Sequence, residues 1–368
     1  MKKILFRLAA VFLAGLSLLA PAGGTALAAG GPFITPLNIS QVASTVPANG
    51  DVNPYGVAVV QASTGKLVKG NVLVSNFNNG DNQQGTGTTI IQISPGGKTS
   101  VFATLTAADL PGSCPGGVGL SAALVELKAG WVIVGSLPTT DGTAATAQAG
   151  CLIVLNSKGK AVETISGAPV NGPWGMTAVE KGSTAYLFVT NVLNGTAAAG
   201  GKEVDQGTVG RIVLSLQGKN DPRVISRNEI GAGFGEKSDP DALLIGPTGL
   251  GVDKSGTLYI ADTLANRVTA ISDALSTLHN LKTGQVVSSG GSLNGPLGLV
   301  VAPNGDILVT NDGDGNLVEI TPGGTQAATK NIDSTHTGAG VLFGLSLTSN
   351  GKGVYFVNDG NNTLNVLH

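Results

Sequence analysis

The sequence predicts an all-β protein, a six-bladed β-propeller of four-stranded antiparallel blades that is closed by an N-terminal strand completing the last blade. Three observations lead to this prediction. One phrase recurs in six copies, some of them degraded: its full form has a Gly-Pro-x-Gly opening, an apolar strand, a Gly turn and a second apolar strand ending in Asn or Asp. Only 12% of the residues are charged and 56 of 368 are Gly, as is typical of short strands joined by tight turns. The last copy ends on its third strand, so one strand is missing there.

The first segment of the chain has the pattern of a secretory leader rather than of a blade. Cationic residues precede an apolar run at Ile4–Leu19, and the small residues Ala26 and Ala28 form a cleavage site. We therefore expect residues 1–28 to be a signal peptide and residues 29–368 to form a single propeller domain. The protein should be exported to a periplasm, a cell surface or the medium.

The charge balance bears on the partners of the exported chain. The formal net charge is −2, and loss of the three cations of the leader makes it −5 (−2 − 3). Nucleic acids and anionic membranes attract basic surfaces, so we expect neither as a partner after cleavage. We expect a monomer.

The six copies begin near residues 53, 116, 172, 246, 295 and 342. Their opening glycines are Gly56, Gly119, Gly175, Gly249, Gly298 and Gly344. Three strands in the phrase and a fourth in the variable segment match the blades of a propeller. A single blade leaves its faces exposed, so its neighbours must cover them in a closed ring. The segment PFITPLNISQVAS, from Pro32, is the unpaired strand that we expect beside the C-terminus, where it removes an exposed edge.

The chain has two cysteines, Cys114 and Cys151. In an exported protein such a pair is most simply a disulfide, here closing a loop of 37 residues (151 − 114). Two free thiols are the alternative.

The copy GPTGLGVDKSGTLYIADTLANRVTAIS, from Gly246, resembles an NHL repeat. The strands ILVTN and VYFVND also resemble the YVTN-type repeats of cell-surface propellers. The NHL resemblance implies six blades. It implies no single activity, because such propellers serve as binding platforms, scaffolds and occasionally enzymes.

The stretch DGDGN places oxygen ligands at every second position, in Asp312, Asp314 and Asn316. An EF-hand loop would need Gly and an acid where Leu317 and Gly323 stand. Asn, Asp and Gly also suit the tight turn between two strands, so a β-hairpin is the favoured interpretation. A surface calcium site with Asp312 and Asp314 is the alternative.

A recurring polar position suggests a ligand site at the mouth of the channel. The second strands end at Asn76, Ser136, Asn191, Asp262, Asn311 and Asn358. The residues before the opening glycines include the aromatic Tyr55, Trp174 and Phe343. If both sets gather at one end of the ring, they form a polar rim with aromatic stacking surfaces. The alternative is that the polar residues cap their own turns and the aromatic rings pack between blades.

Several kinds of catalytic site are not indicated. The histidines His279, His336 and His368 do not fall at equivalent positions of the repeat, so a three-His metal site is not expected. There is no G-x-S-x-G nucleophile motif.

The favoured function is a binding or interaction module without a cofactor. It would take a protein, peptide or glycan ligand through the long loops 76–88, 136–149 and 191–207, which are rich in Asn, Thr and Gly.

The enzyme alternative is a lactonase or esterase of the regucalcin or gluconolactonase type. That resemblance implies a divalent cation, Ca²⁺ or another, held at the mouth by a Glu, Asn residues and an Asp. Asn191, Asp262 and Asn311 would supply part of this set, and Asp239 and Asp241 add acids nearby. No Glu stands at the matching place in the first copy. A cell-surface or matrix structural protein is a third alternative.

Overall fold

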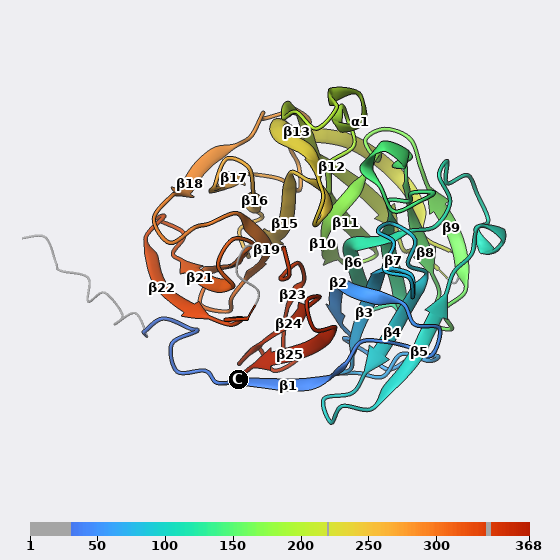
Figure 1. Cartoon of the computed structure of the whole chain (residues 1–368), viewed down its shortest axis with the longest axis horizontal. Coiled ribbons are helices and arrows are strands. Elements are labelled where there is room, and N and C mark those ends of the chain that lie inside the picture. The colour runs from blue at the N-terminus through green and yellow to red at the C-terminus, as the bar shows by residue number, and fades with distance from the viewer. Residues whose placement is uncertain (1–30, 219–220, 336–339) are drawn as a thin grey trace, which may run out of the picture. The chain divides into compact units, whose positions relative to one another are not determined.

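The computed structural model describes residues 31–218, 221–335 and 340–368. Within them, 25 strands form six antiparallel sheets that stand as blades around a common axis (Figure 1). The six-bladed propeller is therefore confirmed, and Pro32–His368 forms one compact unit. The predicted signal peptide, residues 1–28, and His336 lie outside the described residues. No helix in the described ranges has the length and apolar character needed to cross a membrane.

Blades 1 to 5 are built from strands that follow one another in the chain, and blade 6 combines the last three strands with β1. Blade 1 contains β2 (Val52–Val59), β3 (Val72–Asn78), β4 (Thr89–Ile93) and β5 (Thr99–Thr104). Blade 2 contains β6 (Leu120–Leu127), β7 (Trp131–Ser136), β8 (Cys151–Leu155) and β9 (Ala161–Ile165). Blade 3 contains β10 (Pro173–Lys181), β11 (Thr184–Asn191), β12 (Val204–Ser215), β13 (Arg223–Asp239) and β14 (Leu243–Ile245).

Blade 4 contains β15 (Pro247–Val252), β16 (Leu258–Asp262), β17 (Arg267–Ile271) and β18 (Gln285–Ser289). Blade 5 contains β19 (Pro296–Val301), β20 (Ile307–Asn311), β21 (Asn316–Ile320) and β22 (Gln326–Asn331). Blade 6 contains β23 (Leu345–Leu347), β24 (Val354–Asn358), β25 (Thr363–Leu367) and β1 (Ile39–Ser44). The described helical elements are short: α1 (Thr196–Ala199) and the 3₁₀ turns Ala107–Asp109 and Ala144–Thr146.

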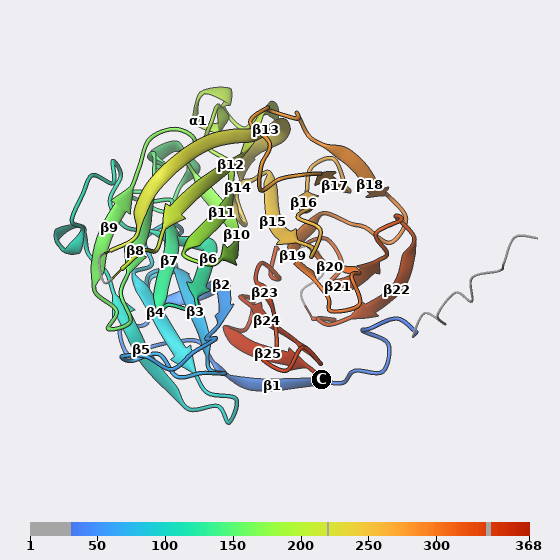
Figure 2. The same cartoon turned by 180° about the vertical axis from the view of Figure 1, so that it is seen from behind.

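The ring closes as the sequence predicts. Strand β1 pairs antiparallel with β25, from Ile39 opposite Leu367 to Ser44 opposite Thr363 (Figure 2). The segment before β1 continues onto blade 5, where the backbone N–H groups of Phe33 and Ile34 donate to the Glu319 carboxylate. We call this segment, residues 32–38, the strap. The strap contacts blade 5 and β1 belongs to blade 6, so together they join the two blades.

Steric contact between adjacent blades explains why glycine stands at most of the opening positions. At four of them, an added Cβ would meet the carbonyl oxygen of the residue before the next opening glycine, at 2.0 to 2.4 Å. These contacts join Gly175 to Thr248, Gly249 to Leu297, Gly298 to Phe343 and Gly344 to Tyr55. The backbones of adjacent blades approach too closely for any side chain there.

Blade 3 departs from the regular pattern. Its fourth strand, β13, is 17 residues long and turns at Asp239–Asp241 into β14, which pairs back onto it. This hairpin places the buried Leu243 and Leu244 in the apolar cluster at the axis. Within blade 2, Cys114 and Cys151 form the predicted disulfide, with their Cα atoms 5.3 Å apart.

Candidate functional site

The mouth is the end of the channel at which the six innermost strands begin, and aromatic side chains fill it. Tyr55 stacks on Phe343 with ring centroids 4.0 Å apart, and Trp174 meets Tyr55 edge-on at 5.8 Å. Phe77 stacks on the other side of Tyr55 at 4.8 Å. With Leu297 these residues form a buried cluster, the aromatic plug, which closes the channel at this end.

The polar positions at the ends of the second strands do not form an exposed rim. All six are buried, and each forms hydrogen bonds with neighbouring protein groups. Asn76 donates to the carbonyl oxygen of Thr45, Asn311 to that of Ser292, and Asn358 to the Asp333 carboxylate. These three bonds reach the segment that enters the first strand of the same blade rather than the turn after the second strand, so the residues do not simply cap their own turns. Ligand binding by this set stays a prediction.

Two of the expected metal ligands also have protein partners. Asn191 accepts the backbone N–H of Asn171 at 3.0 Å, and the Asp262 carboxylate pairs with Arg267 at 2.7 Å. Ser136 lies between the carbonyl oxygen of Gly117 and the N–H of Gly119.

The side chains that reach the aromatic plug come from the next residue along each second strand. These positions hold Phe77, Leu137, Val192, Thr263, Asp312 and Asp359. Successive side chains of a strand point to opposite faces. The residues that end the second strands and the residues that follow them therefore lie on opposite faces. Blades 1 to 3 therefore present apolar side chains at the mouth, whereas blades 4 to 6 present a hydroxyl and two carboxyls.

The two carboxyls form an acidic pair on neighbouring blades. The backbone N–H of Asp359 donates to the carbonyl oxygen of Val341, and Asp312 Oδ1 lies against the adjacent Gly340. Burial, and then the charges of Asp239 and Asp241, raise the pKa of Asp312 to about 6. Burial also raises the pKa of Asp359 well above its usual value, with Asp312 adding to the rise.

Polar atoms without partners surround this pair. Among the described residues, Asp312 Oδ1, the Tyr55 hydroxyl and Trp174 Nε1 are buried without a hydrogen bond of good geometry, although Asn53 beside the hydroxyl and the Gly340 backbone beside Asp312 each act to lower the pKa of their neighbour. Burial raises the pKa of Tyr55 strongly, and the charge of Asp359 adds to it. An unmet buried polar atom costs about 1–3 kcal/mol, and in folded proteins it usually marks a bound water, ion or functional group.

The DGDGN stretch forms the turn between β20 and β21. Asp314 Oδ1 accepts the Asn316 N–H at 3.0 Å and the Asn311 amide at 3.1 Å, so its carboxylate is used within the turn. Asp312 instead lies at the mouth. In the described part of the chain, no group of three or more His, Cys, Asp and Glu side chains is placed to hold a metal.

Sequence reasoning named Asp312 but missed Asp359. The available signal was the tripeptide Asn-Asp-Gly, which ends the second strand in both of the last copies, at Asn311 and Asn358.

The comparisons with known proteins identify the architecture. A scan of family models gives no match, and no curated protein matches the sequence. Among solved structures, a gluconolactonase from Xanthomonas campestris aligns with 91% of this chain and 90% of its own, with 13% identity and a TM-score of 0.56. Regucalcin, a calcium-binding protein from Agrobacterium tumefaciens, aligns over 89% and 93%, with 12% identity and a TM-score of 0.55. A luciferin-regenerating enzyme aligns over 90% and 95%, with 10% identity and a TM-score of 0.56.

At such low identities the likeness establishes the propeller fold alone. It nevertheless corrects the function favoured from the sequence. The expectation of a binding module without catalysis is wrong, because the rings that this one resembles include a gluconolactonase and another named enzyme, which favours the enzyme alternative. The NHL relationship and the monomeric state stay predictions.

Proposed function

We propose that this protein is an exported, divalent-cation-dependent hydrolase that opens a lactone or cleaves an ester at the channel mouth. The observation that carries the proposal is the buried carboxyl pair of Asp312 and Asp359, beside the unpartnered Tyr55 hydroxyl. Carboxyls with displaced pKa values are typical of proton-transfer sites. The likeness to a gluconolactonase supports the same class, and the disulfide supports export.

Asp312 and Asp359 are the residues that would hold the cation. The Oδ1 atom of Asp312 and the repulsion that Asp312 exerts on the Asp359 carboxylate fit a divalent ion, which would neutralise both. Mg²⁺ in particular binds through one or two carboxylates and keeps several waters. When bound, a divalent cation polarises the substrate carbonyl and lowers the pKa of a bound water.

The protein groups themselves can move the protons of hydrolysis. Above pH 6, ionised Asp312 accepts a proton from the water that attacks the carbonyl carbon. Asp312 then returns this proton to the alkoxide released when the ester C–O bond breaks, so Asp359 can stay ionised beside the cation. The aromatic plug beneath them excludes bulk water from the channel side.

The test compares Asp312→Asn and Asp359→Asn with Asp314→Asn, a control two residues from Asp312 whose carboxylate serves only the turn. Hydrolysis of δ-valerolactone and p-nitrophenyl acetate is measured with Mg²⁺, Ca²⁺ or Mn²⁺, and metal content is determined on the purified protein. We expect the first two variants to lose about 100-fold or more in kcat/KM while folded by circular dichroism, and Asp314→Asn to stay within about twofold.

Two results would overturn the proposal. One is wild-type protein that neither binds these cations nor hydrolyses either substrate above background. The other is hydrolysis that the Asp312 and Asp359 variants retain in full.

A further inference from the structure

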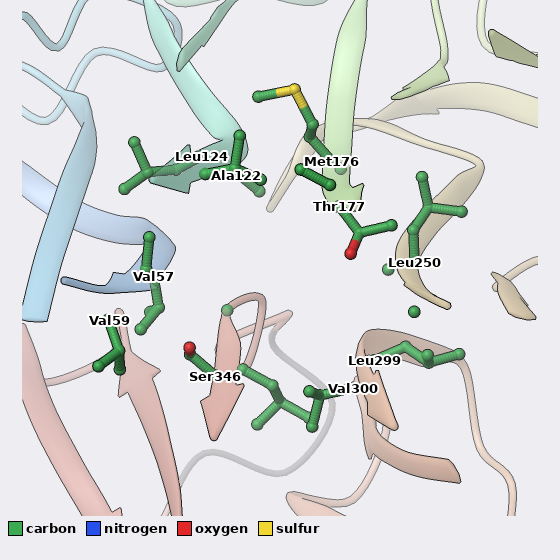
Figure 3. Close-up of a pocket in the computed structure, with 18 of the residues that line it drawn as sticks. Val57, Val59, Ala122, Leu124, Met176, Thr177, Leu250, Leu299, Val300 and Ser346 are labelled. Atoms are coloured by element: carbon green, nitrogen blue, oxygen red, sulfur yellow. The ribbon is translucent and has the colours of Figure 1, made fainter. Parts of the chain in front are cut away.

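The opposite end of the channel is open and forms a second candidate site. Beyond the aromatic plug lies an axial cavity of about 260 Å³, lined by the innermost strands of all six blades (Figure 3). A wider vestibule of about 700 Å³ continues it outward, and the walls of the two have five residues in common: Val59, Gln61, Ala178, Val300 and Ser346. We call the two together the funnel. Its vestibule has the volume of a small-molecule site.

The two sections of the funnel differ in chemistry. The innermost strands each pair with a single neighbour, so their other edges present backbone N–H and C=O groups to the axis. The narrow section is therefore suited to water. The vestibule has an apolar wall from Val59, Ala178, Val300 and Leu347, which suits the hydrocarbon part of a ligand.

The rim of the vestibule carries positive charge. Lys69 and Lys128 line it and are exposed. In the described ranges, the one ion pair within 4.0 Å joins Arg267 to Asp262, so neither lysine has a carboxylate partner there. A ligand anion would meet two ammonium groups at the edge of an apolar surface.

Two acids lie close to the same rim. Glu180 accepts the backbone N–H of Lys128 at 2.8 Å. Glu126 lines the axial cavity, accepts the N–H of Gln61 at 3.0 Å, and is buried with Oε1 unpartnered. Burial raises the pKa of Glu126 to about 7, so near neutral pH it carries only part of a negative charge, and Glu126 and Glu180 together offset part, but not all, of the charge of the two lysines.

We propose that the funnel binds an apolar molecule bearing one carboxylate, with its hydrocarbon part on the vestibule wall and its carboxylate at Lys69 and Lys128. This site lies beyond the aromatic plug from Asp312 and Asp359 and is independent of the proposed hydrolysis. The site would select a ligand that has both a carboxylate for the two lysines and a hydrocarbon part for the vestibule wall.

Isothermal titration calorimetry on the complete exported chain tests the proposal with sodium octanoate, 1-octanol and octyltrimethylammonium. We expect octanoate to bind at one site, at least tenfold more tightly than the other two, and to weaken as salt is added. The double variant Lys69→Gln/Lys128→Gln should lose about tenfold in octanoate affinity. The matched control Lys98→Gln/Lys158→Gln, which removes two exposed lysines from turns outside the funnel, should bind as the wild type does.

A second variant separates shape from charge. Ser346→Phe adds bulk where the two sections meet and should weaken octanoate without changing the net charge. Equal binding of octanoate and 1-octanol, preference for the cation, or unchanged octanoate affinity in the Lys69/Lys128 variant would each overturn the proposal.

Discussion

The strap that fastens the N-terminus to blade 5 offers the sharpest test of how the ring is held closed. Ile34 is fully buried in a cluster with Leu308, Leu342 and Phe356. Ile34→Ala removes this packing and leaves a cavity, at a cost of about 3 kcal/mol in the free energy of unfolding. The Glu319 carboxylate accepts the two N–H groups of the strap at 2.7 and 2.9 Å. Glu319→Gln weakens both bonds and should cost about 2 kcal/mol.

The two substitutions act on one segment, so their effects should not add. When Ile34 no longer anchors the strap, the hydrogen bonds to Glu319 stabilise the fold less. The free energy of unfolding of the double variant should therefore fall by about 4 rather than about 5 kcal/mol. Urea denaturation of the four proteins gives the coupling energy. Hydrogen exchange should show faster exchange in β1 of each single variant.

An exposed isoleucine supplies the control. Ile225 on β13 is 61% exposed, so Ile225→Ala should change the stability by no more than about 0.5 kcal/mol. The reasoning fails if Ile34→Ala is as mild as Ile225→Ala. It also fails if the double variant is strictly additive, because the strap would then not behave as one unit.

Three further predictions concern the rest of the ring. Burial, and then a neighbouring carboxyl, raises the pKa of Asp306 from 3.8 to about 6, so its stabilising contribution is complete below pH 3.8 and is lost as pH rises through 6. Asp306→Asn should flatten that part of the stability profile measured by urea titration between pH 4 and 8. Gly249→Ala places a Cβ 2.4 Å from a backbone carbonyl oxygen and should cost about 2 kcal/mol or more, whereas Gly96→Ala, with nothing nearer than 3.9 Å, should be nearly neutral by thermal denaturation. Replacing Cys114 and Cys151 by Ser reopens a 37-residue loop and should lower the unfolding free energy by about 3–4 kcal/mol in urea.

The blade count and the closure were predictable because the repeat itself records them. Four of the six opening glycines mark places where the backbones of adjacent blades approach too closely for a side chain. The last copy lacks its fourth strand, and the unpaired segment from Pro32 supplies it by pairing with β25. These features depend on local pattern and on counting, which a single sequence supplies.

The composition of the mouth was harder to predict, because it depends on register. The sequence shows that Asn311 ends a strand, but not which of Asn311 and Asp312 points to the axis. Because side chains alternate between the two faces of a strand, the Asn positions and the positions that follow them recur equally regularly around the ring. The apolar Phe77, Leu137 and Val192 would have revealed the shift, since an axis without water is filled by such residues.

The hairpin of β13 and β14 could not be inferred from the repeat, because it belongs to blade 3 alone. Asp239 and Asp241, named from the sequence as acids near the candidate cation ligands, form its turn. Its following residues, Leu243 and Leu244, cover the axis with apolar surface. The pKa of Asp312 rises partly because this turn brings two more acids near it.

The fold explains the apolar half of the mouth but not its acidic half. Apolar side chains at the six axis-facing positions would complete the plug at no electrostatic cost, as they do in blades 1 to 3. Asp312 and Asp359 instead bring two mutually repelling carboxyls beside an unpartnered hydroxyl. Such groups lower stability unless a ligand, an ion or a proton offsets them. A structural role would be served better by the residues already present across the ring, which is why the acidic half is the part that requires a chemical function.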